Sequence, residues 1–459
     1  MTVTPPPLEK TSSGWIPIPG LRTPPPGPAP TAVKLEFHAV KARLHSQIAN
    51  QLNMMALMQL PEPRRRPELR AMIDKIIAHD NKAPVGECDA LAEDLIDDLL
   101  GFGPLEKLLR DPSVSDILIN GPNEVFVDRH GRLDLTETKF RSEGHLMQVL
   151  DRIVSKVGRR IDESSPMVDA RLPDGSRVNA VIAPLALKGP VISIRRFGVK
   201  QLLIEDLLSF RALTPEMAQF FDAIVKARLN AIISGGTGSG KTTLLNALSR
   251  SIPEGERIVT IEDAAELQLQ QRHVVPLETR PPNVEDKGQV TTRDLIRNCL
   301  RMRPDRIIVG ECRSGEAFDM LQAMNTGHDG SLTTLHANTP RDAVARLETM
   351  ILMAGFDLPI KAMRQQIASA VRILVQANRL QGGVRRVTSI SEVVGLEDDV
   401  VQLQEIFAYR QLGIRPNGRA YGRFETTGVK PKCLARLEEE NIEFPPGFFD
   451  KRVLMSDEE

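Results

Sequence analysis

The sequence predicts an α/β protein with a C-terminal domain built on a parallel sheet with helices on both faces, a smaller α+β domain before it, and a helical or disordered leader. Three observations support this. The run GGTGSGKT at 235–242 fits the phosphate-binding pattern G-x-x-x-x-G-K-[ST], with an apolar stretch before it and a helix-forming stretch after it. Strand-length apolar runs alternate with helical segments over about 201–379. Mixed strand and helix signals occupy 114–197.

Length and composition bound the class of protein. A chain of 459 residues has room for about two or three domains, and 41% hydrophobic with 26% charged residues is ordinary for a soluble globular protein. The formal net charge of −1 gives no sign of nucleic acid as a partner. No stretch is long and apolar enough for a membrane span, and the four cysteines form no C-x-x-C pair. We expect a cytosolic protein without a zinc site.

Residues 1–100 divide into a leader and a helical segment. Residues 1–32 hold most of a dense proline run and predict a disordered leader. Residues 33–100 predict a helical N-terminal segment and linker, interrupted by EPRRRPELR at 62–70. This stretch is either a solvated linker, which we favour, or a basic tether for anionic lipid. A further helical stretch, 91–100, ends at the turn GFGP.

Residues 101–197 predict the α+β domain. Apolar residues between Leu146 and Val157 recur at i, i+3, i+4, i+7, i+8 and i+11, which is the pattern of a helix with one buried face. We expect that face to pack onto a small sheet. The β-type runs that would form it lie at 116–119, 124–128, 177–182 and 191–194.

Residues 198–206 are the expected linker to a nucleotide-binding core at 207–425, and 426–459 are expected to form a C-terminal tail. In the core, Thr291 with Asp294 predicts a capping box, and Thr339 with Pro340 starts a helix. The strand-length runs of the core lie at 231–234, 258–261 and 306–309, with further β-type runs at 384–394 and 400–408.

Each residue type in the glycine-rich loop has a role in holding phosphate. Glycines let the backbone turn tightly enough to direct several N–H groups at phosphates, and the following helix adds the positive end of its dipole. Lys241 is placed to reach the β and γ phosphates, and the Thr242 hydroxyl can hold Mg²⁺. The residues expected to bind ATP are Gly235, Gly236, Thr237, Gly238, Ser239, Gly240, Lys241, Thr242 and Thr243.

Two acidic stretches follow apolar runs, where the carboxyl ends of parallel strands form a ligand-binding crevice. In TIED at 260–263, Glu262 can orient water or hold Mg²⁺ through water beside Asp263; an exposed acidic turn is the alternative. In IIVGE at 307–311, the position that usually supplies a Mg²⁺-directing Asp is Gly310. We therefore expect Mg²⁺ to depend on Thr242, Glu262, Asp263 and Glu311, and we favour Glu311 as the base that polarises the attacking water.

The run GHDGSLTTLHAN at 327–338 places His328 and His336 on either side of a short β-type run. The spacing i, i+8 matches no helical zinc motif, and no cysteine is near. A sensor that hydrogen-bonds the γ-phosphate, or a contact between subunits, suits these histidines better than a metal site.

Phosphoryl transfer needs positive charge beyond the lysine, often from a neighbouring subunit. The smaller domain offers Arg171 and Arg177 in RLPDGSR, and the pair Arg195 and Arg196. An arginine on a surface turn is usually only solvated, so these four are weak candidates from their sequence alone.

Taken together, GGTGSGKTT, TIEDAAEL, RMRPDRIIVGECRSGEAFDMLQAMNTGHDGSLTTLHAN and the upstream LPDGSRVN and ISIRRF resemble the secretion and pilus-assembly ATPases of the type II/type IV superfamily. The similarity is greatest to the Tad-pilus, CpaF-like branch and covers about 95–425, in order. The resemblance implies a Walker A box at 235–242, an Asp box at 260–266, an atypical Walker B box at 307–311 and a His box at 327–336.

The resemblance also implies a RecA-like P-loop NTPase C-terminal domain, a smaller N-terminal domain and a homohexameric ring with ATP in the cleft between the domains. Arg171, Arg177, Arg195 and Arg196 would contact phosphates in the manner of the family. Members that carry a zinc module have a cysteine tetrad, which this chain lacks.

The expected function is a Mg²⁺-dependent ATPase motor, cytoplasmic and peripheral at the inner membrane, whose partners are membrane platform proteins of a pilus or secretion machine. Closure around ATP would hinge near 197–206. Two alternatives remain. One is a RecA-like nucleic-acid motor, which the neutral net charge disfavours. The other is a nucleotide-gated scaffold with little turnover.

Overall fold

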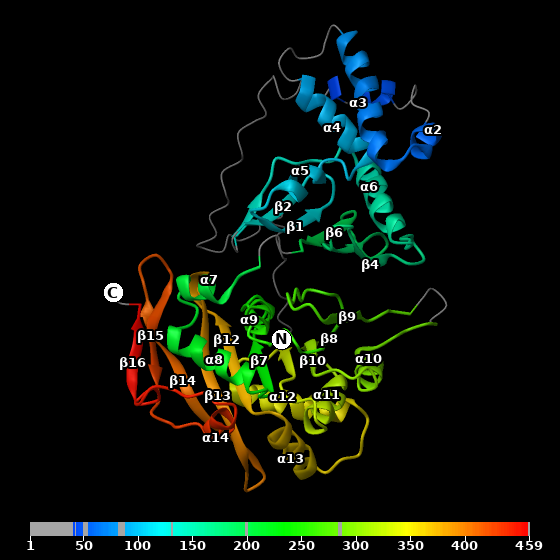
Figure 1. The fold of residues 1–459 in the computed structure, drawn as a ribbon. Helices are drawn as coiled ribbons and strands as arrows, with labels where there is room; N and C mark the ends of the chain where they lie inside the picture. Colours follow the sequence, from blue (N-terminus) through cyan, green and yellow to red (C-terminus); the bar gives the residue numbers. More distant parts are fainter. Residues whose placement is uncertain are drawn as a thin grey trace, which may run out of the picture. The chain divides into compact units, whose positions relative to one another are not determined.

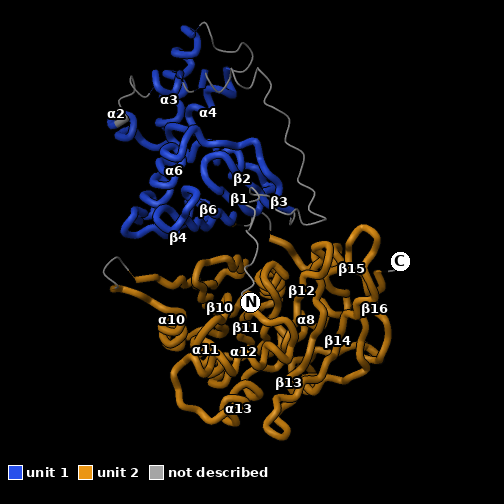
Figure 2. Tube along the Cα trace, turned by 180° about the vertical axis from the view of Figure 1, so that it is seen from behind, with its two compact units in different colours: residues 1–196 blue, residues 197–459 orange. Residues whose placement is uncertain are grey.

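The computed structural model describes residues 40–41, 43–48, 54–80, 88–129, 132–197, 201–282 and 287–457. The chain divides into two compact units, residues 1–196 and 197–459, coloured separately in Figure 2. The leader expected at 1–32 lies outside the described residues, as does part of the linker expected at 198–206.

The first part of unit 1 is helical, with α2 (Met54–Gln59), α3 (Glu62–Ala78) and α4 (Cys88–Leu100) around an apolar cluster that includes Leu69, Ile73 and Leu95. The linker predicted at 62–70 is wrong, because this stretch forms the first turns of α3. Pro63 lies in the first turn, where a backbone N–H has no helical partner to lose, and Pro67 gives up one hydrogen bond.

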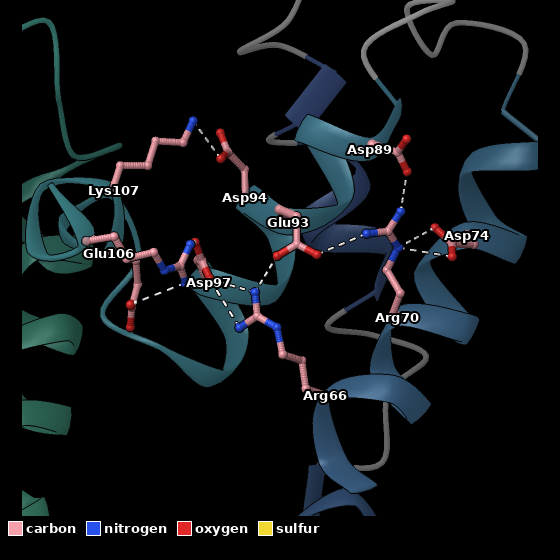
Figure 3. A network of polar contacts seen from close by, with 10 residues as sticks. Arg66, Arg70, Asp74, Asp89, Glu93, Asp94, Asp97, Glu106 and Lys107 are labelled. Carbon is pink, nitrogen blue, oxygen red and sulfur yellow. Dashed lines mark hydrogen bonds and ion pairs between the residues drawn. The ribbon is translucent and has the colours of Figure 1, made fainter. Parts of the chain in front are cut away.

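Ion pairs explain why an arginine-rich stretch folds as a helix here. Arg66 and Arg70 of α3 both reach Glu93 of α4, and the Nη1 atom of Arg70 lies 2.9 Å from a Glu93 carboxylate oxygen (Figure 3). Buried Asp97 of α4 receives two hydrogen bonds from Arg110, at 2.7 and 3.0 Å. Arg110 belongs to α5 (Leu105–Arg110), so the acidic face of α4 is held from two sides. Arg66 and Arg70 are therefore ion-paired structural residues.

The rest of unit 1 is an antiparallel sheet of six strands in the order β3-β2-β1-β6-β5-β4 (Figure 1). Helix α6 (Glu143–Lys156) buries its predicted apolar face against this sheet, and α5 belongs to the same core. The predicted strands are present; β3 and β4 were missed. The strand bounds are β1 (Val114–Asn120), β2 (Val125–Arg129), β3 (Arg132–Leu135), β4 (Met167–Arg171), β5 (Arg177–Val181) and β6 (Val191–Arg195).

Unit 2 is built on one sheet of ten strands in the order β16-β15-β14-β13-β12-β7-β11-β10-β8-β9, with β16 and β9 at opposite edges in Figure 1. From β12 to β9 all neighbours are parallel, and β7 lies between β12 and β11. The parallel strands are β7 (Ala231–Gly235), β8 (Ile258–Glu262), β9 (Val274–Glu278), β10 (Arg306–Cys312), β11 (Leu332–Leu335) and β12 (Ile373–Arg379).

Helices cover both faces of this sheet, as the alternation of strand and helix signals predicts. Adjacent residues of one strand face different cores: Ile233 of β7 belongs to the core of α8 and α9, and Ile232 to the core of α10 to α13. The capping box of Thr291 and Asp294 forms as predicted, and Thr339 caps α12. The helices are α7 (Ile204–Ser209), α8 (Pro215–Lys226), α9 (Lys241–Ser249), α10 (Thr292–Cys299), α11 (Glu316–Asn325), α12 (Pro340–Met353), α13 (Ile360–Ala370) and α14 (Leu434–Glu439). This is the RecA-like P-loop α/β fold predicted above.

The remaining strands extend the sheet as an antiparallel meander. They are β13 (Arg385–Glu397), β14 (Val400–Ile414), β15 (Ala420–Thr426) and β16 (Arg452–Ser456). The segment expected as a tail, 426–459, belongs to this unit, because β16 pairs with β15 and Leu437, Phe448 and Phe449 lie in the core. No helix within the described ranges is long and apolar enough to cross a membrane.

Candidate active site

The glycine-rich loop connects β7 to α9 at the carboxyl edge of the parallel sheet. A Cβ atom on Gly235 would lie 2.2 Å from the carbonyl oxygen of Ala377, so only glycine fits where β7 meets β12. Gly238 and Gly240 have φ angles of +68° and +96°, which bend the loop back towards the start of α9. The glycines of the motif therefore serve both strand packing and loop curvature.

Helix α9 begins at Lys241, inside the motif. Its first backbone bond runs from Leu244 N to Gly240 O at 2.8 Å, so the N–H groups of Lys241, Thr242 and Thr243 have no acceptor within the helix. Such a helix start favours an anion through both its N–H groups and its dipole. The Nζ atom of buried Lys241 donates to Gly236 O at 3.1 Å, and burial lowers the pKa of Lys241. A phosphate would restore charge compensation to this ammonium group.

Glu311 lies at the same edge, near the end of β10. Its carboxylate accepts hydrogen bonds from the Nε and Nη2 atoms of Arg313, at 2.8 and 2.6 Å, and His336 Nε2 lies 2.6 Å from its other oxygen. Burial opposes the charge of Arg313, but the hydrogen bond and the charge of Glu311 raise the pKa of Arg313 overall. One oxygen of Glu311 is thus oriented by the arginine that lies just beyond β10, and the other oxygen lies against the imidazole of the residue after β11.

Glu262 ends β8 and is buried. Its carboxylate accepts from the backbone N–H groups of Glu266 and Leu267, at 2.9 and 3.1 Å, and so shapes the acidic loop that follows. A Cβ atom on Gly310 would lie 2.8 Å from Glu262 Cγ and 3.0 Å from Oε1. The glycine that replaces the usual acid of this strand therefore leaves the space that the Glu262 side chain occupies.

The residues expected to support Mg²⁺ fit an ion that arrives with nucleotide. Among the residues described, no group of three or more His, Cys, Asp or Glu is placed to hold a metal alone. Mg²⁺ usually keeps several waters and binds through one or two carboxylates and substrate phosphates. Thr242 is half-buried at the start of α9, while Asp263 is exposed and accepts from Thr292 Oγ1 at 3.0 Å.

The two histidines predicted as sensor residues lie at opposite ends of β11. His336 follows the carboxyl end of β11 and lies beside Glu311. Burial, and then the charge of Lys241, lower the pKa of His336, so its imidazole is neutral near pH 7. His328 precedes β11, at the opposite end of the strand, where its carbonyl accepts from Ser331 Oγ at 2.7 Å. Only His336 is brought to the glycine-rich loop.

Three of the four candidate arginines of unit 1 form a row. Arg171 of β4 pairs in register with Arg177 of β5, and Arg177 pairs with Arg195 of β6. Directly paired residues share one face of a sheet, and this face is opposite the buried one that carries Val178 and Ile194. Like charges placed directly opposite one another in a sheet repel. The row ends at Asp116, whose Oδ1 lies 3.3 Å from Arg195 Nε.

Arg196 differs from the other three. Its side chain donates to the backbone carbonyls of Asp111 and Val114, the second at 3.1 Å. It therefore fastens the strand end to the loop before β1, which is a structural role.

Sequence reasoning missed two arginines. Arg313 lies two residues after Glu311, the last residue of the Walker B box, and this position was a usable signal. Arg385 Nε donates to Gly238 O at 2.9 Å across a sequence distance that no local pattern reveals.

Comparisons with known proteins identify the family of this chain. The family model described as "Type II/IV secretion system protein" matches residues 98–425. A protein of Mycobacterium tuberculosis named for conjugal transfer is 39% identical over 300 residues, which is 64% of this chain and 85% of that protein. The type IV secretion system protein VirB11 of Bartonella henselae is 31% identical over 318 residues, covering 61% of this chain and 88% of its own length.

Among solved structures, the VirB11 ATPase from the Brucella suis type IV secretion system is similar to this chain. It is 30% identical, with 62% of this chain and 94% of that chain covered and a TM-score of 0.34. The family match spans more than half of the chain, including the glycine-rich loop and both acidic boxes. The protein belongs to the type II/IV secretion system protein family.

Proposed function

We propose that this protein hydrolyses ATP as one subunit of a ring-shaped motor in a pilus-assembly or secretion machine. The observation that carries the proposal is the meeting, at one sheet edge, of a phosphate loop with Lys241 and an oriented carboxylate, Glu311. Membership of the type II/IV secretion system protein family supports the biological setting. The Tad-pilus branch, inferred from the motifs, is the finer assignment.

The residues divide the chemistry between them. The loop N–H groups, the start of α9 and Lys241 bind the β and γ phosphates and compensate the charge that builds up in the transition state. Glu311 accepts a hydrogen bond from the attacking water and aligns it, with the two hydrogen bonds from Arg313 fixing the direction of the carboxylate. Glu262 holds the acidic loop around the site.

Mg²⁺, when bound with ATP, would supply further charge neutralisation on the phosphate oxygens. Thr242, at the start of α9, would hold the ion directly, and Glu262, Asp263 and Glu311, at or near the ends of β8 and β10, would hold its waters. Because Glu262 already accepts two backbone N–H groups, its first role is to shape the loop.

We propose that Arg171, Arg177 and Arg195 bind the phosphates of ATP. In a homohexamer, the row of one subunit would serve the ATP site of a neighbouring subunit. The in-register alignment of these arginines on the solvent face of the sheet supports this proposal. Arg196 is left out because its hydrogen bonds to backbone carbonyls indicate a structural role. Hydrolysis would then move the smaller domain, about a hinge near 197–206, and the ring would drive platform proteins at the inner membrane.

The Lys241→Ala substitution tests the proposed role of the phosphate loop in ATP hydrolysis. Since the ammonium group would bind phosphate and its hydrogen bond within the protein goes to Gly236 O, we expect ATPase turnover to fall at least about 10²-fold with little change in thermal stability. Lys226→Ala, on exposed α8 surface beside Asp222, is the control and should leave turnover unchanged. An unchanged rate in purified Lys241→Ala protein would remove the loop from the mechanism.

Mixed assemblies test the arginine row. Rings that combine Arg177→Gln subunits with Lys241→Ala subunits should regain part of the activity that each variant lacks alone, if the arginine serves a neighbour's site. Phosphate release and native mass spectrometry of the mixtures measure activity and subunit composition. No recovery in rings shown to be mixed would argue against action between subunits.

Two other functions remain testable. A nucleic-acid motor would show ATPase activity stimulated by DNA or RNA with a steep dependence on salt. A nucleotide-gated scaffold would bind Mg-ATP without converting it in a single turnover. The positions of Arg313 and His336 against Glu311 favour hydrolysis over both.

A further inference from the structure

The segment beyond the family match is connected to the phosphate loop by a chain of contacts. The match ends at residue 425, yet Asp457, just after β16, is buried. Its carboxylate lies 3.2 and 3.3 Å from Arg386 Nη2 and accepts a hydrogen bond from the Tyr409 hydroxyl at 2.9 Å. The backbone N–H of Gly422 in β15 also donates to this carboxylate, at 3.3 Å, so the buried acid is held by β13, β14 and β15.

Arg386 of β13 connects Asp457 to the β12–β13 hairpin, which lies beside the phosphate loop. Its Nη1 atom donates to the carbonyl oxygens of Arg385, at 3.0 Å, and of Phe210, at 3.2 Å. One buried guanidinium thus joins the C-terminal acid, the end of α7 and the first residue of β13. Since an arginine presents its N–H groups in a rigid plane, fixing it with a carboxylate also fixes the backbone it binds.

Arg385 completes the connection. Its Nε atom donates to Gly238 O at 2.9 Å, and its Cδ atom would lie 3.6 Å from a Cβ on Gly240. These are the two glycines whose positive φ angles bend the phosphate loop. Opposite Arg385 in the hairpin, Arg379 places a guanidinium nitrogen 3.5 Å from a Cβ position on Gly238. Both arginines therefore pack on the bend of the loop.

We propose that Arg385 is a positioning residue for nucleotide binding, and that Asp457, through Arg386, holds Arg385 in place. The segment after 425 then has a function in the site, since Asp457, the residue after β16, is the acid that holds Arg386 against the backbone of Arg385. The inference rests on the proposed function, because it assumes that the loop binds nucleotide phosphates.

Binding of a fluorescent ADP analogue and steady-state ATPase kinetics on the full chain test the proposal. Arg385→Gln and Asp457→Asn should each raise the Kd and KM about 5- to 10-fold, the value of a lost hydrogen bond at a site, with kcat within about twofold. The double variant should be no weaker than the weaker single variant, because both changes break one connection. Arg410→Gln, whose partners Glu405 and Glu425 lie elsewhere on the same meander, is the matched control and should bind normally.

The results distinguish failure of the connection between Asp457 and Arg385 from failure of the proposed function. Losses that add in the double variant, or normal binding by either single variant, would overturn the connection. If Asp457→Asn does not fold, Tyr409→Phe replaces it: removing one hydrogen bond to the acid should raise Kd about twofold, and an unchanged Kd would overturn the link. A wild-type chain that fails to bind the analogue would instead overturn the proposed function, and this inference with it.

Discussion

Two regions of this molecule concentrate charge, and they use it differently. In the helical part of unit 1, α3, α4 and α5 place arginines and acids in mutual contact. Asp97 is bound by Arg66, as Figure 3 shows, and also by Arg110. At the phosphate loop of unit 2, Lys241 donates to a loop carbonyl, and Glu311 is held by Arg313 and His336. The first cluster pairs its acids with cations across helices, whereas the second places a buried cation against neutral carbonyl oxygen.

Under the proposed function, the difference separates structural from catalytic charge. An ion pair between helices fixes their packing and has no reason to exchange partners. A buried ammonium group that donates to a carbonyl oxygen gains a hydrogen-bonded anionic partner when phosphate arrives, and a carboxylate held by an arginine keeps its direction for a water molecule. The following predictions test this contrast, from the largest expected effect to the smallest.

Glu311→Gln should lower ATP turnover about 10²- to 10⁴-fold, because the amide cannot accept a proton from water. Nucleotide affinity should stay within a few-fold, since Lys241 and the loop are unchanged. Stopped-flow phosphate release and analogue binding measure the two quantities. Glu348→Gln, an ion-paired acid on α12, is the control. A Glu311→Gln enzyme with wild-type turnover would move the catalytic base elsewhere.

Asp97→Asn should lower the free energy of unfolding of unit 1 by about 2 kcal/mol, because Arg110 loses the carboxylate with which it pairs. Nucleotide affinity should not change. Chemical denaturation measures the first and analogue binding the second. Glu439→Gln, in an exposed pair with Arg436, should cost under about 0.5 kcal/mol. Equal effects of the two substitutions would contradict a structural role for the network.

Gly310→Ala should lower kcat about tenfold, because the added methyl group would lie 2.8 Å from Glu262 Cγ and displace the residue that shapes the acidic loop. Gly255→Ala introduces the same methyl group into open space and should have no effect on kcat. Steady-state kinetics with circular dichroism distinguishes loss of activity from loss of fold. Normal kcat in Gly310→Ala would show that Glu262 tolerates a shift.

The sequence predicted correctly the features that depend only on residues close together in the chain. The phosphate loop, the capping box of Thr291 and the apolar face of α6 each depend on residues within a few positions, and each was predicted correctly as structure. The edge that brings Glu311 and His336 together depends on the pairing of β10 with β11, which no local pattern specifies.

The errors have the same cause. The stretch 62–70 reads as a linker because prolines and arginines disfavour a buried helix, but acids of α4, distant in sequence, pair with Arg66 and Arg70. The tail reads as irregular because turn residues separate α14 from β16, yet β15 supplies its missing strand partner. In both cases a tertiary contact overrides local preference.

The most direct measurement is a single turnover of Mg-ATP with protein in excess, comparing wild type, Lys241→Ala and Glu311→Gln for bound nucleotide and released phosphate. We predict that wild type binds and converts ATP, that Glu311→Gln binds but does not convert it, and that Lys241→Ala does neither. Binding without conversion by the wild type, or conversion by Glu311→Gln at the wild-type rate, would contradict the claim that this loop and this acid act on the same ATP.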